Sequence, residues 1–441
     1  AYARRFGVLE CIRFGSKVLG AEYAGVPEEQ IVAAWERWAG NGEAFGDGTG
    51  EWLLTVQHRG SEHTQMYRFD FLILCIGMFG GVANTPTFPP NRGPEVFHGQ
   101  VLHSKDYSDM DAAAAAELIR GKRVAVVGSG KSAFDTAAEC ADANGARFPC
   151  TMICRNPRWM VNGGFVWGVS IGQLFMSRLA ELMVARKPGE GLALCLLAML
   201  LSPLRWLTSK LAEAYFKMHI PMREHGMVPD RSFSWTISAC RLGVLTDRFY
   251  DRVAEGSVVI KRARSVSFCA DGLVLDEHDA GERRVEADVV VLATGFRGAD
   301  KLRGIFVSPT FKEMVAGGPD NPAPLYRQCV HPRIPQMAVI GYSDSSSSIY
   351  HYEMMAKWVA HLLDGAFRLP GVGRMERSVA EWGEYVKRHG AVDGEGPCIS
   401  AVNTWYNDEL CRDMGYDPRR KKGILAEWMQ PYGPADYAGI R

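Results

Sequence analysis

Two short apolar runs begin after an aspartate and end in a glycine, at residues 70–77 and 288–295. Strand-like segments with polar turns precede both runs, over residues 52–69 and residues 266–285. The second segment contains an Asp-Gly pair at Asp271, which is a strong hairpin signal. Apolar, β-branched runs of this length are typical of buried strands in a parallel sheet. The pattern therefore predicts two such strands, each reached through antiparallel hairpins; two ordinary core strands that end in glycine are the alternative.

A third apolar run, residues 124–127, leads into Gly128-x-Gly130-x-x-Ala133 and then into a helical segment from Ser132. The first glycine permits a tight turn, and the second lets a pyrophosphate approach the backbone. The start of the helix offers free N–H groups and the positive end of its dipole. A strand, this turn and a helix in succession predict a dinucleotide-binding unit. Its expected binding residues are Gly128, Ser129, Gly130, Lys131, Ser132 and Ala133, with Thr294 and Gly295 nearby.

The residue after the next strand-like run, residues 150–154, indicates which dinucleotide binds. An acid there would accept hydrogen bonds from the ribose 2′-hydroxyl of NAD, whereas an arginine pairs with the 2′-phosphate of NADP. The chain has Arg155, which we therefore expect to select NADP, with Arg158 and Lys131 as weaker candidates. For each of these three residues, the alternative is a solvated side chain in a loop.

Residues 97–107 place Phe97, Gly99, His103 and Tyr107 in the spacing FxGxxxH followed by xxx[FY]. This spacing is the signature of the flavin-containing monooxygenases and related N-hydroxylating flavoenzymes. With the Ala-Thr-Gly ending of the second aspartate-to-glycine run, the sequence resembles that family over nearly its whole length, and the plant branch above all. Tryptophan in place of Tyr107 would have indicated the related Baeyer–Villiger enzymes.

The resemblance implies an α/β protein with two doubly wound, Rossmann-like domains and with FAD and NADP as cofactors. NADPH would reduce the flavin, which would capture O2 as a C4a-hydroperoxide. One oxygen atom would then pass to a soft nitrogen or sulfur nucleophile of a small molecule, as in N,N-dimethylaniline monooxygenase activity. The protein would hold the flavin and nicotinamide together and exclude water, so no residue is named as catalytic.

The resemblance also suggests roles for three residues outside the glycine-rich turn. Gly99 would allow a close backbone approach near the interdomain cleft, where His103 would form a hydrogen bond across it or serve as a structural linker. Residues 336–341 read as a strand, and the following turn with Asp344 and four serines would cap a helix N-terminus. In related flavoproteins such a helix points its dipole at the flavin, although a simple N-cap is the alternative.

The expected division is a discontinuous FAD domain, residues 1–118 and 297–441, around an NADP domain, residues 119–296, with a helical insert at about 159–245. No second glycine-rich turn follows a strand before Gly77. We therefore expect that about 100 residues with the first βαβ unit of the FAD domain are missing from the start, and that this chain binds FAD poorly. The alternative function is an inactive NADP-binding fragment that lacks FAD. A disulfide reductase would need a CxxC pair, which the sequence does not contain.

Charge and cysteine content narrow the set of partners. Fifty lysines and arginines balance fifty acidic residues, which argues against nucleic acid. The eleven cysteines predict free thiols in a reducing compartment and no metal site. The longest apolar run, residues 192–201, is too short to cross about 30 Å of hydrocarbon. A buried helix is therefore expected, and an interfacial or partner-facing helix is the alternative. The prediction is a soluble, cytoplasmic enzyme without a transmembrane segment that acts on a small molecule and O2. The insert could cover a cleft or select substrates, with added packing or a homodimer contact as the alternative. The enzyme could also associate peripherally with a membrane.

Overall fold

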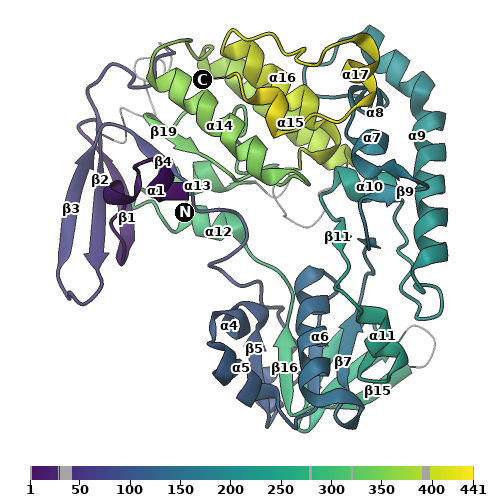
Figure 1. Cartoon of the computed structure of the whole chain (residues 1–441). Helices are drawn as coiled ribbons and strands as arrows, with labels where there is room; N and C mark the ends of the chain where they lie inside the picture. Colours follow the sequence, from purple (N-terminus) through teal and green to yellow (C-terminus); the bar gives the residue numbers. More distant parts are fainter. Residues whose placement is uncertain are drawn as a thin grey trace.

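The computed structural model describes residues 2–27, 29, 42–277, 281–318, 321–389 and 398–440. A five-stranded parallel sheet in the order β12-β7-β6-β16-β5 forms the lower lobe in Figure 1. Its strands are β5 (Gln100–His103), β6 (Val124–Val127), β7 (Cys150–Cys154), β12 (Val258–Arg262) and β16 (Val289–Leu292). Its helices are α4 (Ser104–Asp109), α5 (Ala112–Ile119), α6 (Lys131–Asn144) and α11 (Phe249–Ala254). Every residue of β16 is buried, because the strand lies between β6 and β5. The α/β class and the parallel strand predicted from the second apolar run are confirmed.

Two antiparallel three-stranded sheets account for the predicted hairpins. They consist of β1 (Ser16–Ala24), β2 (Glu51–His58) and β3 (Thr64–Phe69), and of β13 (Ser265–Cys269), β14 (Gly272–Glu277) and β15 (Gly281–Glu286). The first aspartate-to-glycine run gives the short strand β4 (Leu72–Leu74), which pairs in parallel with β19 (Met337–Val339). Strand β5 precedes the expected boundary at residue 119 and is still an edge strand of the five-stranded sheet. The division into domains stays a prediction.

The predicted insert is helical. It contains β8 (Met160–Val161), β9 (Phe165–Val166), β10 (Val169–Ser170), α7 (Ile171–Phe175), α8 (Arg178–Leu182), α9 (Leu192–His219), α10 (Phe233–Ser238) and β11 (Gly243–Val244). Helix α9 follows the outer edge of the molecule in Figure 1. The expectation of a buried helix for residues 192–201 is wrong, since Ala198 alone of these ten residues is buried. Hydropathy is the same for a covered and an uncovered apolar helix, and here no described element covers the outer side.

The remaining α-helices and strands lie mostly in the N- and C-terminal parts of the chain. They are α1 (Tyr2–Arg5), α12 (Gly298–Arg303), α13 (Pro309–Ala316), β17 (Gly317–Gly318), β18 (Asn321–Pro322), α14 (Ser348–Leu363), α15 (Val372–His389), α16 (Asn403–Asp413) and α17 (Ile424–Met429). Helices α14, α15 and α16 form a layer above the sheet lobe in Figure 1. Trp358 of α14 and Tyr406 of α16 are almost completely buried in the core of this layer.

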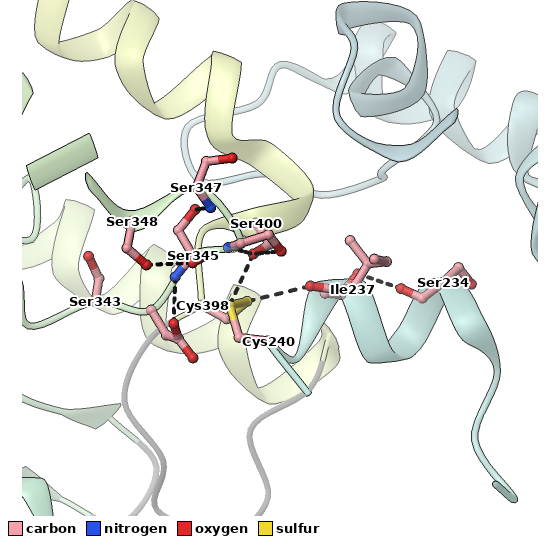
Figure 2. The surroundings of a disulfide bond; sticks show 12 residues. Ser234, Ile237, Cys240, Ser343, Ser345, Ser347, Ser348, Cys398 and Ser400 are labelled. Carbon is pink, nitrogen blue, oxygen red and sulfur yellow. Dashed lines mark hydrogen bonds between the residues drawn. A yellow bond between two sulfur atoms is a disulfide. The ribbon is translucent and has the colours of Figure 1, made fainter. Parts of the chain in front are cut away.

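One disulfide connects the insert to this C-terminal layer. Cys240, just after α10, is joined to Cys398 with a Cα–Cα distance of 5.6 Å, and the other nine cysteines are free thiols. Figure 2 shows the disulfide beside the serine-rich turn that precedes α14. The prediction of free thiols is thus wrong for this pair. The two cysteines are 158 residues apart and belong to no motif, so only the tertiary fold brings them to bonding distance.

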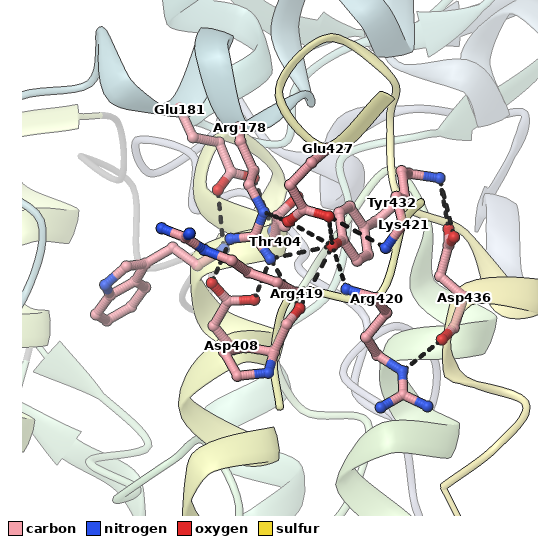
Figure 3. A network of polar contacts seen from close by, with 12 residues as sticks. Arg178, Glu181, Thr404, Asp408, Arg419, Arg420, Lys421, Glu427, Tyr432 and Asp436 are labelled. Carbon is pink, nitrogen blue, oxygen red and sulfur yellow. Dashed lines mark hydrogen bonds and ion pairs between the residues drawn. The ribbon is translucent and has the colours of Figure 1, made fainter. Parts of the chain in front are cut away.

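A buried ionic network makes a second connection between the same two parts (Figure 3). Arg178 of α8 binds both carboxylate oxygens of Asp408 in α16 and also pairs with Glu427 in α17. Nearby, the carboxylate of Glu181 accepts the backbone N–H groups of Thr404 and Trp405 at the start of α16, at 2.7 and 2.8 Å. Burial raises the pKa of Glu181 to about 8. These contacts hold the insert against the C-terminal helices.

Candidate functional site

The turn between β6 and α6 has the conformation that a dinucleotide-binding unit requires. Gly128 has φ +156°, and a Cβ atom on it would lie 2.4 Å from the carbonyl oxygen of Ala293. Its N–H donates to the Ile153 carbonyl at 2.9 Å. Gly130 is the N-cap of α6 and has no side chain to cap the first N–H groups of that helix. These groups therefore remain available for an anion.

This turn forms one wall of a large cleft with a volume of about 1230 Å³. Eight of the ten predicted cofactor-binding residues line it: Gly128, Ser129, Gly130, Lys131, Ser132, Arg155, Thr294 and Gly295. The carboxyl ends of parallel strands meet at one edge of a sheet, which explains why residues from three loops converge here. Ala133, also predicted to bind the cofactor, does not line the cleft. It is fully buried, as is Ala137, so α6 packs closely on the sheet.

The cleft is strongly cationic. Six positively charged residues line it against one carboxylate, that of Asp230: Lys131, Arg155, Arg158, Arg231, Arg241 and Arg264. The guanidinium of Arg155 is exposed and forms no hydrogen bond or ion pair with the described residues. The Lys131 ammonium, by contrast, pairs with Asp135 and donates to Thr246 Oγ1 at 3.1 Å. Arg155 is thus the better placed of these two cations to bind a phosphate.

The insert supplies an aromatic residue to the same cleft. The guanidinium carbons of Arg231 and Arg241 lie 5.2 and 5.8 Å from the ring centroid of Trp235 in α10. Cation–π contacts of this kind hold the ring in place, while the N–H groups in the plane of each guanidinium can still donate hydrogen bonds. Sequence reasoning missed these three residues, because they belong to no local motif and reach the cleft through the packing of the insert.

Two antiparallel segments cross beside the cleft. Thr294 Oγ1 donates to the Asn84 carbonyl at 2.6 Å, and Asn84 Nδ2 donates back to the Thr294 carbonyl at 3.2 Å. The backbone N–H of Asn84 donates to the Gly295 carbonyl at 2.9 Å. These three hydrogen bonds hold Thr294 and Gly295, the end of the second aspartate-to-glycine run, next to the glycine-rich turn. Asn84, which the sequence analysis did not select, also lines the cleft.

The family model described as "FMO-like: Flavin-binding monooxygenase-like" matches residues 43–421. The chain belongs to this family. It is 34% identical to "Probable flavin-containing monooxygenase 1" of Arabidopsis thaliana over 99% of this chain and 81% of the relative. It is 31% identical to "Putative flavin-containing monooxygenase 2" of the same plant over 95% of this chain and 80% of that protein.

The fold of this family member is similar to that of solved structures that contain bound NADP. Cyclohexanone monooxygenase from Rhodococcus sp. Phi1 bound to NADP+ superposes with a TM-score of 0.59 at 15% identity, over 93% of this chain and 80% of the other. The OTEMO complex with FAD and NADP gives a TM-score of 0.53 at 16% identity, over 88% and 80%. At such identities the likeness shows the fold alone.

The family signature has a structural role. Phe97 is buried against Phe268, and a Cβ atom on Gly99 would lie 2.3 Å from the Phe97 ring and 2.4 Å from the Asp288 carbonyl oxygen. His103 caps α4, because its Nδ1 accepts the Lys105 N–H at 3.1 Å. Burial lowers the pKa of His103. His103 is therefore a helix cap in this structure, its predicted role at the interdomain cleft stays a prediction, and Tyr107 is a buried residue of α4.

The serine-rich turn after β19 differs from expectation. Helix α14 begins at Ser348, but no side chain caps it, so the prediction of a well-capped N-terminus is wrong. Serine and aspartate instead bind their own turn: Asp344 Oδ1 accepts the Ser345 N–H at 2.8 Å, and Ser348 Oγ donates to the Ser345 carbonyl at 2.6 Å. Asp344 does not line the cleft and lies beside Cys398. Its contact with a flavin stays a prediction.

Proposed function

We propose that this protein is an NADPH- and FAD-dependent monooxygenase that transfers one oxygen atom from O2 to a nitrogen or sulfur atom of a small molecule. Family membership supports the reaction type, and the cationic cleft beside the glycine-rich turn is the observation that carries the cofactor proposal. FAD, when bound, supplies electron transfer from NADPH and the activation of O2. The chain supplies binding, orientation and exclusion of water.

The cleft suits NADP in shape and charge. The N-terminus of α6 and the space above Gly130 would hold the pyrophosphate, because the nearest described atom to a Cβ at Gly130 is Arg158 Nη1 at 3.8 Å. The 2′-phosphate would lie at Arg155. Trp235, between its two arginines, would cover the far side of the dinucleotide and exclude water from it.

The candidate flavin contacts lie in the turn after β19. The hydroxyl groups of Tyr342 and Ser343 are buried and have no hydrogen-bond partner among the described residues, which is expected where a polar ligand completes the site. Asp344 follows them directly. We assign no residue to the FAD pyrophosphate, because within the described part of the chain a GxGxx[GA] turn from parallel strand to helix follows β6 alone.

Replacement of Arg155 by alanine is expected to weaken NADPH binding about 10- to 150-fold, since a charged hydrogen bond contributes about 1.5–3 kcal/mol. NADH has no 2′-phosphate and is expected to bind the variant and the parent equally. Titration calorimetry with both dinucleotides measures this. Lys131→Ala is the matched control with a smaller expected effect, because its ammonium is already paired with Asp135. Equal losses for NADPH and NADH would contradict the selecting role of Arg155.

An anaerobic absorption spectrum of the purified chain with added FAD, followed by NADPH titration, tests the function. Contrary to the weak FAD binding expected from the sequence alone, the proposal requires bleaching of the visible flavin band, its return when oxygen is admitted, and an oxygenated amine or thioether product detected by mass spectrometry. NADPH binding without bound or bleached flavin would overturn the proposal and leave a dinucleotide-binding protein. Bleaching and reoxidation with hydrogen peroxide as the sole product would refute oxygen transfer.

A further inference from the structure

Helix α9 exposes an apolar surface that no described element covers. Leu192 and Leu200 are each 76% exposed, and Trp206 is 62% exposed. By length and composition, α9 is also the one described helix that could cross a membrane. A monomeric soluble domain rarely leaves a continuous apolar surface of this extent in water. Some apolar medium or partner is therefore expected to cover it.

The distribution of these side chains around the axis distinguishes a lipid phase from a protein partner. Successive residues of a helix are about 100° apart, so the exposed Leu192 and Leu194 point to nearly opposite sides. A partner protein packs along one stripe of a helix, whereas lipid surrounds all sides that the protein leaves free. The C-terminal half is different: it buries Ser209, Ala212 and Phe216 on one face. This half holds α9 on the protein, which excludes a simple span.

Exposed aromatic rings lie next to this surface. The β9–β10 hairpin carries Phe165 and Trp167, which are 60% and 55% exposed. The Trp167 indole N–H donates to the Leu211 carbonyl of α9 at 3.3 Å, and its ring meets the edge of Tyr215. The hairpin and the helix therefore form one continuous surface. Tryptophan rings with an apolar body and a polar N–H are typical of the boundary between lipid chains and headgroups.

Within residues 159–219 of the insert, the charged side chains that reach solvent are basic. Between residues 159 and 219, all of which the structure describes, the three acidic side chains are Glu181, Glu190 and Glu213. Each of them is enclosed and hydrogen-bonded within the protein. The same segment has six basic residues: Arg178, Arg186, Lys187, Arg205, Lys210 and Lys217. Arg186 and Lys210 among them are exposed, and Lys210 pairs with Glu213 at 2.8 Å. The excess of basic over acidic residues makes the surface around the apolar helix complementary to anionic headgroups.

We propose that α9 and the β9–β10 hairpin dock on the surface of a bilayer that contains anionic lipids, with the N-terminal half of α9 embedded in the interface. A second copy of the chain is the less suitable occupant, because pairing two inserts would bring together two segments that each have more basic than acidic residues. Such a pair would also leave several sides of the first turns of α9 uncovered. This inference stands apart from the proposed reaction, because it uses none of the residues of the cleft.

Vesicle flotation of the full chain tests the proposal. Vesicles of phosphatidylcholine mixed with phosphatidylserine are expected to carry the protein upward, and phosphatidylcholine alone to carry less of it. The variant Leu200→Glu is expected to reduce the bound fraction at least about 10-fold, because burial of a leucine contributes about 1.5–3 kcal/mol. Met66→Glu on β3 is the matched control, since Met66 is 60% exposed on a different sheet, and it is expected to float like the parent.

Sedimentation velocity and circular dichroism on the same proteins complete the test. Unchanged spectra for both variants would establish that the loss of flotation in L200E comes from the surface and not from unfolding. The proposal is overturned if the parent does not float with anionic vesicles or if L200E floats as well as the parent. A dimer that L200E dissolves, without vesicle binding by the parent, would identify a second copy as the occupant instead.

Discussion

Replacement of Gly128 by alanine is expected to weaken NADP binding by about 5- to 150-fold, which corresponds to about 1–3 kcal/mol of overpacking. The added Cβ would lie 2.4 Å from the Ala293 carbonyl oxygen, which is a backbone atom with no freedom to rotate away. Ala293 donates its own N–H to the Val127 carbonyl at 2.8 Å, so β6 and β16 would have to separate at the point where the binding turn begins. Titration calorimetry with NADP+ measures the affinity, and thermal unfolding measures the stability.

Two further glycine variants separate strain in the protein from contact with the ligand. Gly130→Ala places its Cβ in open space within the cleft, so we expect normal stability and weakened NADP+ binding. Gly163→Ala has no described atom within 4 Å of the added Cβ and should change neither property. If Gly128→Ala bound NADP+ like the parent, the glycine-rich turn would not be the pyrophosphate site. If Gly130→Ala lost stability instead of affinity, the assignment of the space above Gly130 would be wrong.

The parts of this site that the sequence predicted are those that a local pattern determines. Gly128, Gly130 and Arg155 each follow the end of a parallel strand, and this geometry brings such residues to one edge of the sheet whatever the rest of the chain does. Trp235 and its two arginines reach the cleft on an insert, whose path depends on distant contacts such as the Cys240–Cys398 disulfide. No property of those residues in the sequence indicates that destination.

The two wrong predictions, a buried helix at residues 192–201 and a capped α14, also depend on contacts that a local pattern does not determine. Residues 192–201 have the composition of a core helix, and whether such a helix is covered depends on neighbours that hydropathy does not encode. The serines near Asp344 predict a cap, because serine and aspartate prefer the N-cap position. The same side chains can also bind the backbone of their own turn, and in this structure they do. The serines and aspartate thus locate the turn correctly, but their presence does not determine which backbone N–H groups their side chains bind.

Replacement of Arg178 by methionine is expected to lower the free energy of unfolding by about 3–5 kcal/mol, since it leaves buried carboxylates without their cation. The Arg178 side chain is 13% exposed, and those of its partners Asp408 and Glu427 are 5% and 9% exposed. Its Nη2 atom also donates to the Pro418 carbonyl at 2.9 Å. The loss should therefore detach α8 from the C-terminal helices. Denaturant unfolding followed by tryptophan fluorescence measures it.

The pH dependence of this loss identifies its cause. Burial raises the pKa of Asp408 in the native protein, and Arg178 opposes that shift. Without Arg178 the native pKa of Asp408 rises further above its unfolded value, so the folded variant binds a proton that the unfolded chain releases. The penalty should be smallest below the unfolded pKa of the carboxyl and should grow as pH rises through the folded pKa. Arg68→Met removes an exposed ion pair with Glu51 and should cost about 1 kcal/mol or less, with little dependence on pH. If the loss of unfolding free energy in R178M did not change with pH, its cause would be the packing of the side chain and not the unpaired carboxylates.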